Sequence, residues 1–318
     1  KSNQYPGKMT KSLYRAAYEY VTACGQGSEK HRVSVSRILK LLGVSRSGYY
    51  AWKKRGPSDS EKHREQIKDR IKDIYEESHH NYGAPKITEK LKKEGEHISE
   101  KTVGNYMRQM GIRAQWSKHY TVTAIHPDLS SQLHNILDEQ FDPVNPDTAW
   151  VSDITYIWTT EDGFVYLTSI MDLFSRKIIA WTLSRTLEAG PVAGTVQKAK
   201  ETRGIKTGSP LVFHTDRGCQ YVSEAFLEAT EGMENSYSKK GYPWDNACIE
   251  SFHALIKREW LGRFRIRDYD EAYRLVFEYI EAFYNTVRIH SHCCYLSPVQ
   301  YEARYPGGLE DTSITGGV

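Results

Sequence analysis

The 318-residue sequence has little cysteine, and its few cysteines suit neither a metal site nor a disulfide framework. The five Cys are odd in number and show no CxxC pair and no zinc-finger spacing, so we expect free thiols. No run approaches the about 18 apolar residues of a membrane span, and the first residues, KSNQYPGKMTKS, lack the apolar stretch of a signal peptide. No segment repeats at a fixed period. These absences exclude a zinc finger, a secreted disulfide scaffold and a repeat array, and they predict a cytoplasmic protein with no membrane partner.

The composition that remains is that of a folded chain with a divided charge. With 39% hydrophobic and 26% charged residues, 22 Tyr and 7 Trp, the sequence can bury a sizeable core, and its length predicts two domains. Residues 1–120 carry 25 Lys and Arg against 13 Asp and Glu, whereas residues 121–318 carry 18 against 27. The basic front half indicates a polyanionic partner, because Lys and Arg neutralise phosphates. The acidic back half indicates that its carboxylates have a role other than binding a polyanion.

Residues 1–56 contain a pattern of two short helices, in the stretch VSVSRILKLLGVSRSGYYAWKKR. Ile38 and Leu42 lie on one apolar helical face, Gly43 breaks it, and Ser45 can cap a second helix. This pattern predicts a helix-turn-helix-like DNA-binding region, with an ordinary helical hairpin and a solvated basic face as the alternative. The expected DNA contacts lie at the end of the second helix: Lys53, Lys54 and Arg55.

Residues 57–119 predict a second helical DNA-binding region built from three helices. The second of these begins near Pro85, which suits a first helical turn, and the third begins at Ser99. Basic residues line the outer face of the third helix and its exit, namely Lys101, Arg108 and Arg113. We expect them to contact phosphates, and simple solvation is the alternative.

The pattern changes after residue 120. Residues 120–146, rich in proline and without periodicity, predict a linker, and 306–318 predict a flexible tail. Between them, residues 147–305 begin with three β-branched and aromatic strands joined by short turns, and continue with alternating helices and strands. A mixed α/β domain around a central sheet is the fold that this order favours.

Three acidic residues stand out by their position in this domain. Asp153 lies inside an otherwise apolar strand, Asp216 ends the strand LVFHTD, and Glu250 lies on a later helix. A charge in a buried strand is costly unless it is paired or binds a metal. Carboxylates from a strand centre, a strand end and a facing helix can converge, and hard oxygen ligands suit Mg²⁺ or Mn²⁺.

Five segments in order make the sequence resemble a known family. They are WVSDITYI, FVYLTSIMDLFSRKIIAW, FHTDRGCQYVSEAF, SKKGYPWDNACIESFHALIKRE and YNTVRIHSHCCYLSPVQYE. With them, residues from about 145 to 303 resemble the catalytic domain of insertion-sequence transposases of the IS-three family, within the superfamily of D-D-E transposases and retroviral integrases. VSRSGYYAW and NYGAPKITEKL extend the resemblance to the front half.

The resemblance implies an α/β ribonuclease H-like catalytic domain, with a mixed five-stranded sheet and helices, preceded by all-α helix-turn-helix DNA-binding regions. It implies that Asp153, Asp216 and Glu250 are catalytic and hold two Mg²⁺ or Mn²⁺ ions. It implies a transposase that cleaves and joins DNA strands at the terminal inverted repeats of an insertion sequence through a circular intermediate, as a homodimer or higher oligomer acting on double-stranded DNA. One departure is visible, because 33 residues separate Asp216 from Glu250 where the family usually has 35.

The same family pattern marks residues around the three acids. Lys257 lies two helical turns beyond Glu250, and Asn246 lies one turn before it, and both are expected DNA contacts, as is Arg217. Arg288 and His290 belong to the late YN-x-x-R-x-H element, where Arg288 either contacts the transferred strand or braces the catalytic helix. Two further residues are expected to support the site without binding metal, namely Asp172 and His214.

Two rival functions remain open at the level of sequence. A DNA-binding regulator with an inactive catalytic-like domain is one, although all three acids are present in strand and helix contexts. A metal-dependent ribonuclease on the same fold is the other, and the two helix-turn-helix-like regions disfavour it. The chain begins with Lys, which is compatible with the downstream portion of a longer fusion protein of this family.

Overall fold

The computed structural model describes residues 7–25, 34–55, 58–114, 133–206, 208–239 and 242–305. The first part of the predicted linker, residues 120–132, and the predicted tail, residues 306–318, therefore lie outside the described residues. The chain divides into two compact units, Lys1–Asp73 and Ile74–Val318. The division falls within one long helix.

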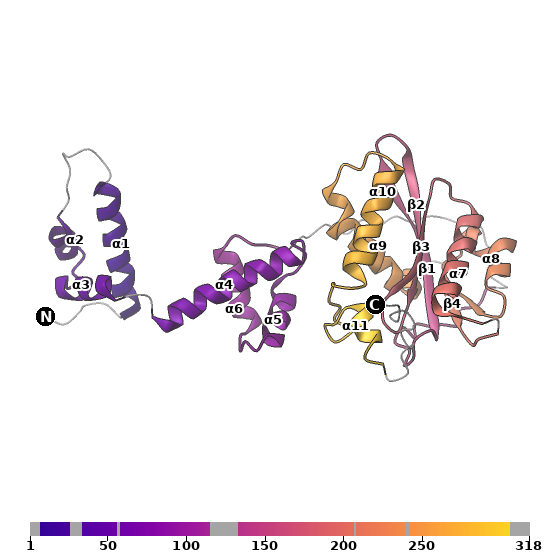
Figure 1. Cartoon of the computed structure of the whole chain (residues 1–318), viewed down its shortest axis with the longest axis horizontal. Helices are drawn as coiled ribbons and strands as arrows, with labels where there is room; N and C mark the ends of the chain where they lie inside the picture. The colour runs from indigo at the N-terminus through magenta and orange to yellow at the C-terminus, as the bar shows by residue number, and fades with distance from the viewer. Residues whose placement is uncertain are drawn as a thin grey trace, which may run out of the picture. The chain divides into compact units, whose positions relative to one another are not determined.

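Helices make up the front of the chain, and a sheet with covering helices makes up the rest (Figure 1). The front helices are α1 (Gly7–Gly25), α2 (Val35–Leu41), α3 (Arg46–Lys54), α4 (Asp59–Glu77), α5 (Ala84–Lys93) and α6 (Glu100–Gln109). The strands are β1 (Ala149–Thr159), β2 (Gly163–Asp172), β3 (Ile178–Ser184), β4 (Val212–Thr215) and β5 (Glu234–Tyr237). The helices of that region are α7 (Ala189–Arg203), α8 (Glu224–Ala229), α9 (Ala247–Glu259), α10 (Tyr269–Phe277), which continues as a π-helix over Glu278–Tyr284, and α11 (Pro298–Glu302).

In the first unit, α2 and α3 form the predicted pair of short helices. The Ser45 hydroxyl accepts a hydrogen bond from the Gly48 N–H, so Ser45 caps α3 as its sequence position predicts. Leu39 and Tyr49 are buried against Tyr14 of α1. Both helices are thereby fixed by packing, because helices of seven and nine residues are too short to be stable alone.

The two helices that follow α4 also begin where the sequence predicts. Pro85 lies in the first turn of α5, where its missing N–H costs nothing. The Ser99 hydroxyl accepts from the Thr102 N–H and caps α6. Their buried faces, which include Ile87 and Val103, form the core between them.

The sheet has five strands in the order β3-β2-β1-β4-β5. β1, β2 and β3 pair antiparallel, which confirms the predicted three-stranded meander, whereas β4 and β5 pair parallel to β1 and to each other. Parallel neighbours require crossovers, and α7 and α8 supply them. This is the mixed five-stranded sheet that the sequence predicts.

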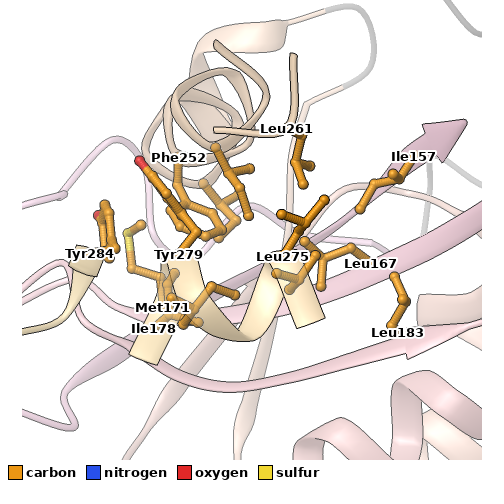
Figure 2. Packing of buried hydrophobic residues seen from close by; sticks show 14 of the residues in the cluster. Ile157, Leu167, Met171, Ile178, Leu183, Phe252, Leu261, Leu275, Tyr279 and Tyr284 are labelled. Atoms are coloured by element: carbon orange, nitrogen blue, oxygen red, sulfur yellow. The ribbon is translucent and has the colours of Figure 1, made fainter. Parts of the chain in front are cut away.

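Helices cover both faces of the sheet, with α9 and α10 on one side and α7 and α8 on the other (Figure 1). Alternate residues of β1 lie on opposite faces of the sheet. Val151 and Ile157 pack under α9, whereas Trp150 packs toward α7. Figure 2 shows the first of these cores, in which Phe252 of α9 and Leu275 of α10 lie over the strand residues. The position of α9 is therefore set by apolar packing along most of its length.

Among the described residues, no helix combines the length and the apolar composition that crossing a bilayer requires.

Candidate active site

Asp153 lies at the centre of β1, on the face covered by α9. Its backbone is paired with Ser169 of β2, and it shares a face with the buried Val151. The carboxylate is half-buried, and its Oδ2 lies 3.2 Å from Nδ1 of His253 on α9. A charge at this buried position is thus supported by one nearby polar partner from the covering helix.

Asp216 follows directly on β4, beside Asp153. Ser152 and Thr215 are partners in the parallel pair β1 and β4, so the next residue of each strand is one of the two acids. The Gly218 N–H donates to Asp216 Oδ1 at 2.9 Å. A Cβ at position 218 would lie 3.0 Å from that oxygen, so a larger residue here would press on the Asp216 carboxylate.

Glu250 lies in the first turn of α9, and the start of that helix is tied to β1. Asn246 Nδ2 donates to the Ser152 carbonyl oxygen at 3.2 Å, next to Asp153. The pKa of Glu250 is raised, first by loss of surrounding water and then by the negative charges of Asp153 and Asp216. Glu250 is therefore close enough to Asp153 and Asp216 for the negative charges to repel one another.

The described residues contain no group of three or more His, Cys, Asp or Glu side chains that could hold a metal ion as they stand. The donor chemistry is nevertheless that of a magnesium or manganese site, because all three side chains offer hard carboxylate oxygens. Their mutual repulsion is also what a bound divalent cation would relieve.

Comparison with known proteins identifies the family of the chain. Residues 143–243 and 231–298 match the family described as integrase core domain, and residues 62–120 match the HTH-like domain. The transposase InsF for insertion sequence IS3A of Escherichia coli (strain K12) is 33% identical over 280 residues, which are 86% of this chain and 96% of that protein. The chain belongs to this family of insertion-sequence transposases.

A second sequence relative is similar to about the same extent, whereas the similarity to solved structures is lower. The transposase for insertion sequence element IS904 of Lactococcus lactis subsp. lactis (strain IL1403) is 34% identical over 250 residues, covering 78% of this chain and 98% of that one. Among solved structures, a chain of the simian T-cell lymphotropic virus intasome in complex with PP2A regulatory subunit B56 gamma is 15% identical, with a TM-score of 0.43 and coverage of 78% of this chain and 80% of that one. The family membership rests on the sequence relatives.

One residue of the site was not found from the sequence. His253 of α9 is buried, and its two ring nitrogens lie 3.2 Å from Asp153 Oδ2 and 3.3 Å from Ser169 Oγ. The signal for it was its spacing, because a residue three positions after Glu250 lies on the same helix face. That spacing also suits an ordinary core residue, so only the contact itself distinguishes the two roles.

The predicted DNA contacts on α9 differ in exposure. Lys257 is exposed, and its charge interacts with that of Asp153. Asn246 is buried and holds the start of α9 against β1, as described above. Asp245, two residues before α9, accepts the Lys239 N–H at 2.6 Å through Oδ2, so it ties the start of the helix to the segment after β5.

Arg288 and His290 lie inside the domain. Both Nε and Nη2 of Arg288 donate to the Glu259 carboxylate at 2.7 Å, and both residues of this ion pair are buried. The structure thus favours the alternative in which Arg288 braces the catalytic helix, whose last residue is Glu259. The half-buried ring of His290 adjoins the same region, and burial lowers its pKa to about 3, with Arg288 adding to the shift.

The remaining predicted residues fall into three sets. His214 and Arg217 hold β5, since the ring nitrogens of His214 lie 2.8 Å and 3.1 Å from the hydroxyls of Ser236 and Ser238, and Arg217 Nε donates to the Ser238 carbonyl at 2.7 Å. The helical residues predicted to contact phosphates are all exposed: Lys53, Lys54, Arg55, Lys101, Arg108 and Arg113. Asp172 is fully buried in an ion-pair network at the end of β2.

Proposed function

We propose that the transposase binds the terminal inverted repeats of its insertion sequence and catalyses metal-dependent cleavage and transfer of DNA strands. The observation that supports this most directly is the placement of the three acids. Asp153 and Asp216 lie side by side on neighbouring strands, and Glu250 is close enough for both charges to contribute, after burial, to its raised pKa. Those three residues would hold two Mg²⁺ or Mn²⁺ ions. When bound, such ions activate the attacking oxygen and stabilise the leaving oxygen of an in-line displacement.

The reaction needs two displacements at phosphorus and no protein nucleophile. In the first, water breaks a phosphodiester bond at the element's end and leaves a 3′-OH. In the second, that 3′-OH attacks another phosphodiester, so one bond forms as one breaks. Family resemblance suggests joining beside the element's other end, which yields a circle that later inserts. Pairing two ends requires at least a dimer on double-stranded DNA.

The front helices provide the cations for recognition of the ends. Exposed basic residues on α3 and α6 would contact phosphates, and a few helix side chains would read bases. Lys257 would hold the DNA end near the acids, and its exposed position on α9 and its electrostatic interaction with Asp153 support this role.

A cleavage assay tests this function. The substrate is a labelled duplex carrying either end of the DNA that flanks the coding region, incubated with Mg²⁺, Mn²⁺ or EDTA and resolved on a denaturing gel. We expect nicked and joined products with either metal and none with EDTA. Binding of the duplex without any metal-dependent product would contradict the enzymatic function, and cleavage of an RNA–DNA hybrid alone would indicate a ribonuclease.

The contact of His253 with Asp153 leads to a separate prediction. His253→Ala should raise the metal concentration needed for half-maximal cleavage by about 10- to 100-fold, because residues that orient a ligand carboxylate tune its affinity by that amount. A titration of Mn²⁺ against initial cleavage rate measures it. Ser251→Ala, at an exposed position of the same helix, is the matched control. An unchanged metal dependence in His253→Ala would show that the contact does not orient Asp153.

A further inference from the structure

A buried polar cluster connects the turn before α5 with the end of the catalytic helix. We call it the Glu259 junction, and it consists of Tyr82, Lys86, Glu259, Tyr279 and Arg288. At its centre, Glu259 accepts two hydrogen bonds from Arg288 at 2.7 Å and one from the Tyr279 hydroxyl at 2.9 Å. The carboxylate is thus fully engaged, and Glu259 is 4% exposed.

Tyr82, which lies just before α5, connects that helix to this cluster. Its ring is 2% exposed, and its hydroxyl accepts the Ile289 N–H at 2.9 Å and donates to the Val287 carbonyl at 3.4 Å. It therefore holds the backbone on both sides of Arg288. Tyr82 belongs to the NYGAPK segment, which the proposed chemistry leaves without a role.

Lys86 lies over the Tyr82 ring, with its Nζ 5.0 Å from the ring centroid. Burial lowers the pKa of Lys86 to about 7, Arg288 adds to that shift, and Glu259 opposes it. Asn81 and His79 extend the contact, since Asn81 Oδ1 accepts from Arg263 and the His79 ring meets the edge of Trp260 at 4.9 Å between centroids. These contacts all reach the end of α9 or the segment that follows it.

The position of Glu259 on α9 gives the junction its significance. Asn246 fastens the start of the helix to β1, and Glu259 is its last residue, so the helix is held at both ends. Glu250 lies nine residues before Glu259, about 13 Å along the axis. A helix transmits such a constraint as a rigid rod, and a shift of about 1 Å in a reacting group can cost about 100-fold in rate.

We propose that Tyr82 and Lys86 are positioning residues, which set α9 through the Glu259–Arg288 pair and thereby place Glu250 for strand cleavage. This rests on the proposed function of Glu250. A buried ion pair contributes little net stability but holds a specific geometry and is costly to break. The Glu259 junction contains such a pair. It joins its elements by polar contacts, whereas an apolar cluster could have packed the same elements together.

The test uses the full chain with Tyr82→Phe and Lys86→Met. Tyr82→Phe keeps the ring and leaves the Ile289 N–H without its acceptor. The controls are Tyr273→Phe and Lys92→Met, both at exposed positions. Three quantities are measured: affinity for the labelled end duplex, single-turnover cleavage at saturating protein, and hydrogen exchange in the last turn of α9.

We expect cleavage to fall about 10- to 100-fold in both test variants, with unchanged end affinity and faster exchange in that turn. Nicking of a nonspecific duplex with Mn²⁺ should fall in parallel, because α9 serves every substrate. Weaker end binding with unchanged nicking would overturn the inference and make Tyr82 and Lys86 parts of a DNA-binding surface. Wild-type cleavage and exchange in both variants would also overturn it. If the wild type cleaves no DNA, the proposed function fails, and the exchange measurement alone decides whether the junction holds α9.

Discussion

Glu250→Gln is expected to reduce strand cleavage by about 1,000-fold or more, equivalent to at least about 4 kcal/mol of barrier. Glutamine keeps the size of the side chain but removes the charge that a divalent ion requires of its ligand. Because the Glu250 side chain is exposed and repelled by Asp153 and Asp216, its neutralisation should leave the fold intact. End binding, which the proposed function assigns to the front helices, should be unchanged.

Single-turnover cleavage of the end duplex and a mobility shift of the same duplex measure the two quantities. Asp153→Asn and Asp216→Asn should behave alike, because each removes one of the three carboxylates. Glu228→Gln, an exposed acid on α8, is the control for a general change of charge. A variant that cleaves at the wild-type rate would remove its residue from the set of metal ligands.

The shortened spacing before Glu250 is compatible with this expectation. Helix α8 has only six residues, and a turn at 230–233 leads directly into β5. The chain between Asp216 and α9 is therefore short, yet the charge of Asp216 still contributes to the raised pKa of Glu250, after burial and the charge of Asp153. The 33-residue interval is therefore compatible with an electrostatic interaction between Asp216 and Glu250.

The sequence predicted those features whose cause is local. The β-branched and aromatic runs predicted β1 to β3, and the caps Ser45 and Ser99 predicted helix starts, because each depends on neighbouring residues. Asp153 stood out because a charge inside an apolar strand is anomalous by itself. The mixed sheet and the three acids also agree with the family pattern.

Features that depend on distant partners could not be predicted in this way. Arg288 has the sequence context of a basic surface, and only the fold shows its partner Glu259, 29 residues earlier. His253 has the spacing of a core residue, and its role follows from a contact with Asp153, 100 residues away. The π-helix over Glu278–Tyr284 likewise has no separate signal in an apolar helical pattern. A contact between two side chains that are remote in the sequence leaves no signal in the hydrophobic periodicity of either segment.

Arg203→Met is expected to destabilise the catalytic domain by about 3–5 kcal/mol, the range for breaking a buried ion pair. Arg203, the last residue of α7, lies 3.2 Å from Asp172 and 3.3 Å from Asp147, and it also pairs with Glu302. Burial raises the pKa of Asp172 to about 7 even though Arg203 opposes the shift. Without the guanidinium, three carboxylates would face one another inside the protein. Denaturant unfolding measures the loss.

Asp172→Asn separates the structural role of this residue from a catalytic one. Asparagine keeps one oxygen, which can still accept one of the two N–H groups that Asp147 and Phe174 donate to separate oxygens at 3.0 Å. Arg203 also keeps its pairing with Asp147 and Glu302, so the loss of stability should be smaller than in Arg203→Met. Asp172 is paired with Trp150, three positions along β1 from Asp153, or about 10 Å. Cleavage per folded molecule should therefore be unchanged. A variant that is stable but cannot cleave would place Asp172 among the metal ligands, because a purely structural acid cannot abolish the chemistry while the fold persists.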